Sequence, residues 1–414
     1  MVPKLIYDDS YNDIEYGRFS RFVNRSLLMH EPPVIEALHF KLVNICGTGD
    51  IQVWIRAVDK RRVRELNIEI GTFSSNTTPI TLPRSLYTCC RMLVTLKLRN
   101  VVLVDDITTP ISFPVLKNLS LRLIRYPSDL FLSSLLSSCS VLEDLFLEQC
   151  GDDNISVLSV RVPSLKSLVL RRLENKFNND VHSYVIDAPS LERVEISDFS
   201  RGPCSVESNM TKIVDAELSN SKWDPWKTFM CSIISAKRLY LCLPTSKDVY
   251  PAGSVFYNLV HLKMCTCETE WVNLLIRVLR DSPKLRTLKL AECAFLVSQC
   301  HEFRRREPCP YWDETSLVSE YLLSSLETFE WVDYKGTKAE KEVVAFILRV
   351  SSCLKKATII SSNPLLTTTR SLRCSRIFPY HLGAHQPVFL HSSGVMFKNQ
   401  SNIVFLDLRS YIRY

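Results

Sequence analysis

The densest group of potential metal ligands in the chain contains five cysteines and one histidine: Cys265, Cys267, Cys293, Cys300, His301 and Cys309. Cysteine thiolates and histidine nitrogens are the usual ligands of structural zinc. None of these cysteines forms the CxxC pair that is typical of such sites. Cys267 and Cys293 each follow the leucine of a repeated motif by eight residues, the place that Cys150 takes in another copy. We therefore expect buried structural thiols and no metal site.

Nucleophilic catalysis would need a serine or cysteine beside a histidine base and an orienting acid. Before residue 364 the chain has five histidines, His30, His39, His182, His261 and His301. None stands beside a GxSxG sequence or a comparable nucleophile turn. Only 10 glycines occur in 414 residues, which argues against loops that cradle phosphates. The sequence predicts a protein that is not an enzyme and has no cofactor.

The net charge of +7 is concentrated at the C-terminal end of the chain. Residues 364–414 contain six basic residues and one acidic residue, a net charge of +5, and the first 363 residues carry the remaining +2. Nucleic-acid binding needs a basic surface, so the nearly neutral body argues against such a partner. A nucleic-acid-binding alternative would depend on residues 364–414.

Two features of the sequence concern the compartment. The first 17 residues include four acidic residues and lack the apolar core of a signal peptide. No apolar run approaches the roughly 20 residues that a membrane helix requires. We therefore expect the 15 cysteines to be reduced, and we expect a protein of the cytoplasm or nucleus with no membrane partner.

The elements that must position any site are set by an internal repeat, LxxLxLxx followed by an apolar residue or cysteine. Its first position recurs thirteen times, strongly at seven places and more weakly at six: Leu93, Leu116, Leu142, Leu165, Leu191, Leu259 and Leu285, then Ile35, Val63, Ile213, Ala236, Leu326 and Leu354. From Leu93 to Leu285 the steps are 23, 26, 23, 26, 22, 23, 23 and 26 residues. Such periods are typical of leucine-rich repeats.

The spacing within each repeat predicts a short strand, because residues two apart point to the same face of a strand. In segments 131–140 and 270–282, apolar residues recur at spacings of three and four residues, as they do on one face of a helix. We therefore predict an α/β leucine-rich-repeat solenoid. It would have a curved parallel β-sheet on the concave face, and helices and irregular returns on the convex face.

The outward positions of successive strands should line up on the concave face and offer a surface for a protein partner. Arginine and aromatic residues are frequent at binding hot spots. Our candidate partner-binding residues are Lys97, Arg99, Arg122, Phe146, Glu148, Arg171, Glu195, Tyr240, Lys263 and Lys289. Taken one at a time, each is also explained as an ordinary solvated strand residue.

Residues 322–359 carry a more specific signal, a series of short motifs: SLE (325–327), EW (330–331), Tyr334, GT (336–337), EKE (340–342) and LKK (354–356). This segment resembles the FBD domain of plant F-box proteins. The repeats before it, with phrases such as VPSLKSLVL and DAPSLE, resemble those of the same F-box, leucine-rich-repeat and FBD family, the FBD-associated F-box proteins.

The resemblance implies the substrate-recognition part of an SCF-type E3 ubiquitin ligase receptor, with an unknown protein substrate and a Skp1-like adaptor as partners. Family members dock the adaptor through an F-box that precedes a VPKL-like phrase, and the chain starts at that phrase, so the F-box itself is expected to be missing. The alternative is a stand-alone repeat scaffold or truncated product without a ligase role.

The expected domain organisation follows: a remnant after the F-box (1–30), the repeats (31–300), an inserted loop (301–320), the FBD-like repeats (321–360) and a divergent tail (361–414) that we expect to be disordered.

Overall fold

The computed structural model of the chain describes residues 4–10, 16–30, 34–43, 48–71, 80–104, 110–149, 155–172, 183–198, 204–220, 226–243, 255–267, 271–292, 323–361 and 369–373. The chain forms two compact units, Met1–Ile213 with Asn220–Ile233, and Val214–Ser219 with Ile234–Tyr414. We call the first the N-terminal unit and the second the C-terminal unit.

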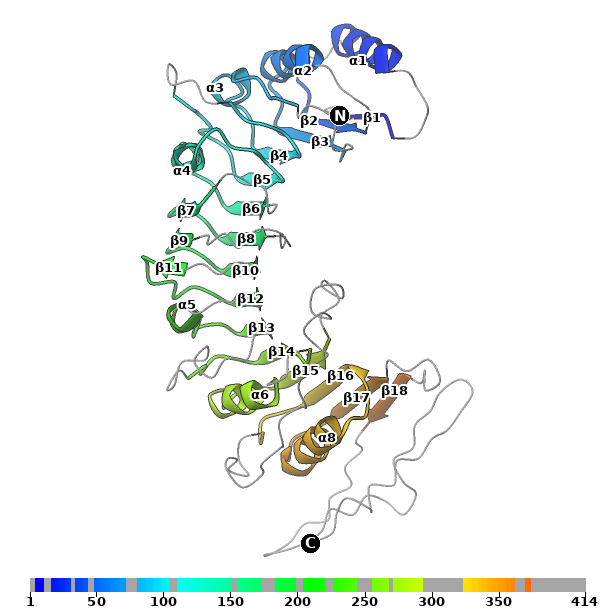
Figure 1. The fold of residues 1–414 in the computed structure, drawn as a ribbon, viewed down its shortest axis with the longest axis vertical. Helices are drawn as coiled ribbons and strands as arrows, with labels where there is room; N and C mark the ends of the chain where they lie inside the picture. Colours follow the sequence, from blue (N-terminus) through cyan, green and yellow to red (C-terminus); the bar gives the residue numbers. More distant parts are fainter. Residues whose placement is uncertain are drawn as a thin grey trace, which may run out of the picture. The chain divides into compact units, whose positions relative to one another are not determined.

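A long parallel sheet runs through the N-terminal unit (Figure 1). Its strands are hydrogen-bonded in the order β1 (Lys4–Asp8), β2 (Ala37–Leu42), β3 (Glu65–Ile70), β4 (Thr95–Arg99), β5 (Asn118–Arg122), β6 (Asp144–Gln149), β8 (Ser167–Arg172) and β10 (Arg193–Asp198). Apart from β1, each of these strands begins two residues after a first position of the repeat. The repeat therefore predicts where the strands start.

The core of the N-terminal unit is a ladder of leucines along these strands. Leu96 pairs with Leu119, Leu119 with Leu145, and Leu145 with Leu168. All four side chains are at most 2% exposed. Since one strand cannot bury its apolar face alone, each repeat depends on its neighbours for its core.

The return segments of the N-terminal unit lie on one side of this sheet (Figure 1). Some are helical: α1 (Tyr16–Met29), α2 (Thr48–Lys60), α3 (Ser85–Thr88), α4 (Asp129–Ser137) and α5 (Trp226–Ser232). Three others form a second, smaller parallel sheet made of β7 (Val157–Arg161), β9 (Ser183–Asp187) and β11 (Cys204–Val206). The repeat motif gives no sign of this small sheet, although VLSVR and SYVID alternate buried and less buried residues as strands do.

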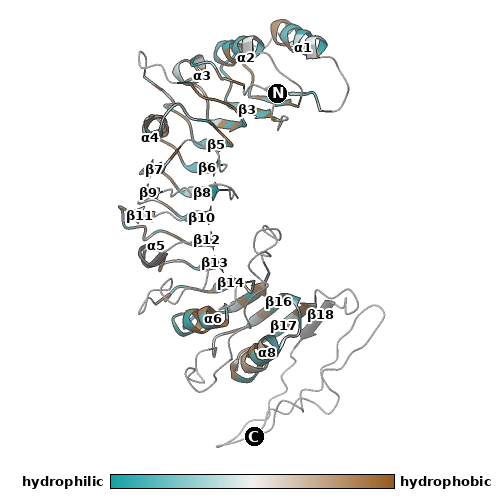
Figure 2. Ribbon diagram, viewed as in Figure 1, coloured by the Kyte–Doolittle hydropathy of each residue, from teal (hydrophilic) through white to brown (hydrophobic). Residues whose placement is uncertain are grey.

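The C-terminal unit has the same organisation. Its sheet is ordered β12 (Asp215–Asn220), β13 (Arg238–Cys242), β14 (His261–Cys265), β15 (Thr287–Ala291), β16 (Thr328–Tyr334), β17 (Lys356–Ser361) and β18 (Thr369–Arg373). All neighbours pair in parallel except β18, which is antiparallel to β17. The helices among its described residues are α6 (Trp271–Arg280) and α8 (Lys338–Val350), and Figure 2 shows both hydrophobic and hydrophilic residues on each. Such mixed helices bury one face and expose the other.

The structure of the C-terminal unit explains several of the FBD motifs found in the sequence. Trp331 is fully buried and meets Trp271 edge to face, with ring centroids 5.5 Å apart. Gly336 has a φ of +75°, which glycine adopts without strain. Thr337 caps α8: its hydroxyl accepts from the Glu340 amide, and the Glu340 carboxylate accepts from the Thr337 amide at 2.9 Å. The GT and EKE motifs therefore form a turn and a helix start.

The structure confirms the predicted α/β leucine-rich-repeat solenoid with its parallel sheet, and the helices predicted at 131–140 and 270–282 correspond to α4 and α6. The expected inserted loop at 301–320 lies outside the described residues, as does most of the expected tail. The described parts of that tail are residue 361, which ends strand β17, and residues 369–373, which form strand β18.

Candidate protein-binding face

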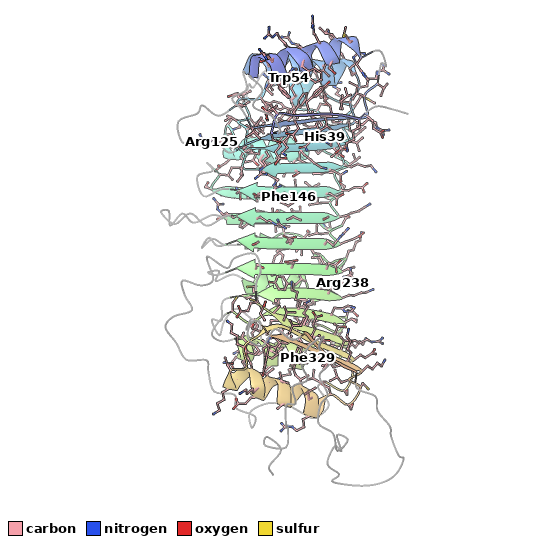
Figure 3. The ribbon with its side chains drawn as sticks, turned by 90° about the vertical axis from the view of Figure 1, so that its right-hand side faces the viewer. His39, Trp54, Arg125, Phe146, Arg238 and Phe329 are labelled. Carbon is pink, nitrogen blue, oxygen red and sulfur yellow. The ribbon has the colours of Figure 1, made fainter. Side chains whose placement is uncertain are left out.

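The outward strand positions of the N-terminal unit form two parallel rows of side chains, which we call the strand face. One row runs through Lys97, Ser120, Phe146, Val169 and Glu195, and the other through Arg99, Arg122, Glu148, Arg171 and Ser197. Seven of the predicted residues therefore lie in register on five neighbouring strands, β4, β5, β6, β8 and β10. Figure 3 looks onto this face, with Phe146 among the strands of the N-terminal unit.

Phe146 is the centre of the strand face. The guanidinium of Arg122, from the strand before, lies 5.4 Å from the centre of its ring, and that of Arg171, from the strand after, lies 5.3 Å away. Both distances fall within the range of cation–π attraction. The aromatic ring is therefore held between two cations from neighbouring repeats.

Two carboxylates orient those cations. Arg122 donates from Nε to Glu148 Oε2 at 2.9 Å, and Arg171 donates from Nε to Glu195 Oε1 at 2.7 Å. The Glu148 side chain is only 11% exposed, whereas that of Arg122 is 38% exposed. We call Arg122, Phe146, Glu148, Arg171 and Glu195 the Phe146 cluster. Its parts come from four repeats, so only a correctly stacked solenoid assembles it.

The remaining N-terminal candidates also pair with carboxylates. Arg99 donates to Glu69 at 2.6 Å, and the Lys97 ammonium lies 3.5 Å from Glu65. Glu65 also contacts Nε2 of His39 at 3.1 Å. Burial lowers the pKa of His39, and the neighbouring Glu65 carboxylate opposes that shift. His39 thus joins the polar network of the strand face through its contact with the Glu65 carboxylate.

Sequence reasoning missed the carboxylates Glu65 and Glu69 on β3 and Glu330 on β16. The signal was present, because all three fill outward positions in the weaker copies of the repeat. Glu65 and Glu69 balance the charges of Lys97 and Arg99, so the strand face presents alternating positive and negative groups. In the C-terminal unit, Glu330 balances the charge of Lys289.

The other three candidates belong to the C-terminal unit. Tyr240, Lys263 and Lys289 are paired in register across β13, β14 and β15. The Lys263 ammonium stands 4.2 Å from the centre of the Tyr240 ring, and Lys289 donates to Glu330 at 2.7 Å. This group repeats the cation–aromatic chemistry of the Phe146 cluster on a smaller scale.

Of the cysteines and histidine weighed as metal ligands, the described residues include Cys265 and Cys267, whereas Cys293, Cys300, His301 and Cys309 lie outside them. The structure brings Cys265 and Cys267 together with Cys242, a residue that the sequence did not single out. Cys242 is 23 residues before Cys265, one repeat step earlier, and that spacing was a usable signal.

Comparison with known proteins gives matches of two kinds. The FBD family matches residues 314–359, and the LRR repeats of the FBD-associated F-box protein At5g56370 match residues 51–218. The chain is 55% identical to the FBD-associated F-box protein At5g56390 of Arabidopsis thaliana over 366 residues, which cover 87% of the chain and 83% of that protein. A second Arabidopsis thaliana relative, the FBD-associated F-box protein At1g32375, is 56% identical over 88% of the chain and 84% of its own length. The chain belongs to the FBD-associated F-box protein family.

Membership in the FBD-associated F-box family confirms the predicted family and the plant relatives, and the F-box in the family's name implies the ubiquitin pathway. It indicates a protein-interaction role in F-box complexes. In the part of the chain that the structure describes, no helix has the length and apolar character to span a bilayer.

Proposed function

We propose that the chain is the substrate-recognition part of an SCF-type E3 ubiquitin ligase receptor and that it binds its protein substrate on the strand face of the N-terminal unit. The Phe146 cluster carries this proposal. It combines an aromatic ring with two arginines, the residue types that dominate binding hot spots.

The cluster is organised before any partner arrives. Freezing a long side chain on binding costs about 0.5–1.5 kcal/mol, and Arg122 and Arg171 are already held by Glu148 and Glu195. A partner therefore meets an ordered surface and loses less affinity to side-chain ordering. The alternating charges favour a partner segment that has both an apolar group and polar groups of either sign.

The strand face can be tested by quantitative co-purification of the tagged full chain from plant cells. We expect the triple variant Arg122→Ala, Phe146→Ala, Arg171→Ala to lose most of the proteins that the wild type retains. The control is the triple variant Arg56→Ala, Val157→Ala, Arg161→Ala on the return side, where Arg161 pairs with Glu207 through hydrogen bonds of 2.8 Å. Equal partner recovery from both variants would contradict the proposal.

We also propose that the chain works in an F-box complex with a Skp1-like adaptor, in the cytoplasm or nucleus, because its relatives are named F-box proteins. An antibody against the endogenous full-length protein should co-precipitate the adaptor. Recovery of a substrate without any adaptor would contradict a ligase role and favour a stand-alone scaffold.

A further inference from the structure

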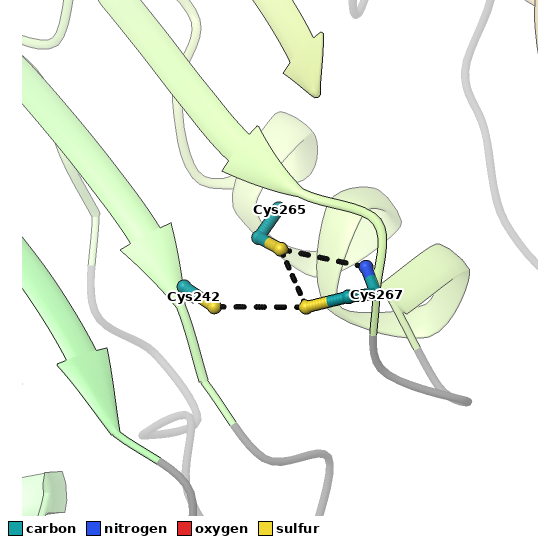
Figure 4. Close-up of side chains that lie close together, drawn as sticks. All are labelled: Cys242, Cys265 and Cys267. Atoms are coloured by element: carbon teal, nitrogen blue, oxygen red, sulfur yellow. Dashed lines mark hydrogen bonds between the residues drawn. The ribbon is translucent and has the colours of Figure 1, made fainter. Parts of the chain in front are cut away.

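Three cysteine sulfurs meet at the end of two paired strands in the C-terminal unit (Figure 4). Cys242 ends β13, Cys265 ends β14, and Cys267 lies two residues further along, after the strand. The Sγ of Cys267 is 2.6 Å from that of Cys265 and 3.8 Å from that of Cys242. All three sulfurs lie within 4.8 Å of one another.

The surroundings of this group favour a soft ligand. Cys242 is 6% exposed and Cys265 is 4% exposed, while Cys267 is partly accessible. Tyr240 of β13 packs against the group. Among the described residues, the ligand atoms that converge here are sulfur alone, without a carboxylate or imidazole. An all-sulfur donor set selects Zn²⁺ or Cu⁺ over hard cations such as Mg²⁺ and Ca²⁺.

Other buried thiols of the chain behave differently. Cys90 donates to the carbonyl of Ser85 at 3.7 Å, and Cys139 donates to the carbonyl of Leu135 at 3.2 Å. Each thiol donates to a backbone carbonyl, which is how a structural cysteine in a core is usually satisfied, and Cys139 also contacts the Ser138 hydroxyl at 3.8 Å. At Cys267, by contrast, two further thiol sulfurs are the neighbours.

We infer that Cys242, Cys265 and Cys267 form a three-thiolate binding site for one thiophilic d¹⁰ metal ion, Zn²⁺ or Cu⁺. Each ligating thiol gives up its proton, which passes to the solvent. Three thiolates leave a bound Zn²⁺ one position for a fourth donor, and they complete a trigonal Cu⁺ site.

The spacing of the sulfurs is close to what such an ion needs. With metal–sulfur bonds of about 2.3 Å, tetrahedral geometry separates the sulfurs by about 3.8 Å. The Cys242–Cys267 separation of 3.8 Å already fits, and Cys265 and Cys267 must move apart by about 1 Å. A bound ion would link two consecutive repeats beside Tyr240.

The site can be tested by anaerobic titration of the reduced full chain, with Zn²⁺ in one series and Cu⁺ in another, against a chromophoric chelator. We expect one equivalent of at least one ion to bind, and we expect Cys267→Ser to weaken that binding by about 100-fold or more, since even outer-shell partners of a metal change affinity 10–100-fold. Cys353→Ser, which removes an exposed thiol of the same unit, is the matched control and should bind as the wild type does.

Two further readouts separate ligation from folding. Co²⁺ added to the wild type should give the sulfur-to-metal absorption of a thiolate site, and this absorption should be absent in Cys267→Ser while circular dichroism stays unchanged. Metal should also raise the Tm of the wild type and of Cys353→Ser, but not of Cys267→Ser. Failure of the wild type to bind either ion, or equal binding by wild type and Cys267→Ser, would overturn the inference.

Discussion

At the scale of single residues, two residues that are adjacent in the sequence can have opposite environments. In a strand, the reason is that successive side chains point to opposite faces. Leu145 is 1% exposed in the leucine ladder, while Phe146, next to it, faces outward between two arginines. Cys89 is exposed and Cys90 is buried. In each pair, the properties of a buried residue and of its exposed or outward-facing neighbour can therefore be compared directly.

The cysteine pair gives a prediction about reactivity. Burial raises the pKa of Cys90 to about 12, with smaller contributions from the charges of Asp59 and Cys89. Only the thiolate reacts readily, so at pH near 8 iodoacetamide should modify Cys89 and leave Cys90 intact in the folded chain. Fragment-ion mass spectra of the peptide SLYTCCR distinguish the two sites. In denaturant both should react, and equal rates without denaturant would show that Cys90 is not buried.

The Leu145 and Phe146 pair predicts a difference in stability. Leu145→Ala removes a fully buried side chain and should cost about 2–5 kcal/mol of unfolding free energy. Phe146→Ala mainly removes two cation–π contacts, each worth about 0.5–1 kcal/mol at exposed sites, and should cost clearly less. Urea unfolding of both variants measures the difference. A Phe146→Ala cost as large as that of Leu145→Ala would mean that Phe146 belongs to the core.

At the scale of elements, strands were predictable from the sequence and several returns were not. Strand starts follow the repeat because the LxL spacing fixes which residues face inward, and α4 and α6 follow from apolar spacing of three and four. The strands β7, β9 and β11 could not be predicted in this way, because their pairing partners come from returns of other repeats. The same limit applies to β1, which pairs with β2 but carries no copy of the repeat.

The turn before α8 gives a prediction at this scale. A methyl group at Gly336 would have room, since the nearest side-chain atoms lie 3.7 Å and 3.8 Å from the position that its carbon would occupy. The φ of +75° is what opposes a side chain, so Gly336→Ala should destabilise the C-terminal unit by about 1–2 kcal/mol. Gly336→Asn is the control, because asparagine tolerates this region better. Thermal unfolding would contradict the account if Ala were tolerated as well as Asn.

At the scale of the whole molecule, the sequence predicted which residues of the candidate site face outward, but it did not predict which of them pair with one another. Outward residues can be read from the repeat, and all the candidate residues lie on outward positions of the strands. The pairing of Arg99 with Glu69 and of Lys289 with Glu330 depends on register between strands 30 and 41 residues apart. Register across so many residues needs the folded sheet, so the balance of charge at the outward strand positions of each unit emerges only from the structure.

The central claim is that a protein partner contacts the strand face at Phe146. Photocrosslinking tests it most directly, with p-benzoylphenylalanine in place of Phe146 in one chain and of Val157, which is 44% exposed on β7, in another. The account predicts that the Phe146 position gives discrete crosslinked protein species in plant cells and that the Val157 position does not. Crosslinking from Val157 alone, or from neither position in cells where the wild type recovers its partners, would contradict it.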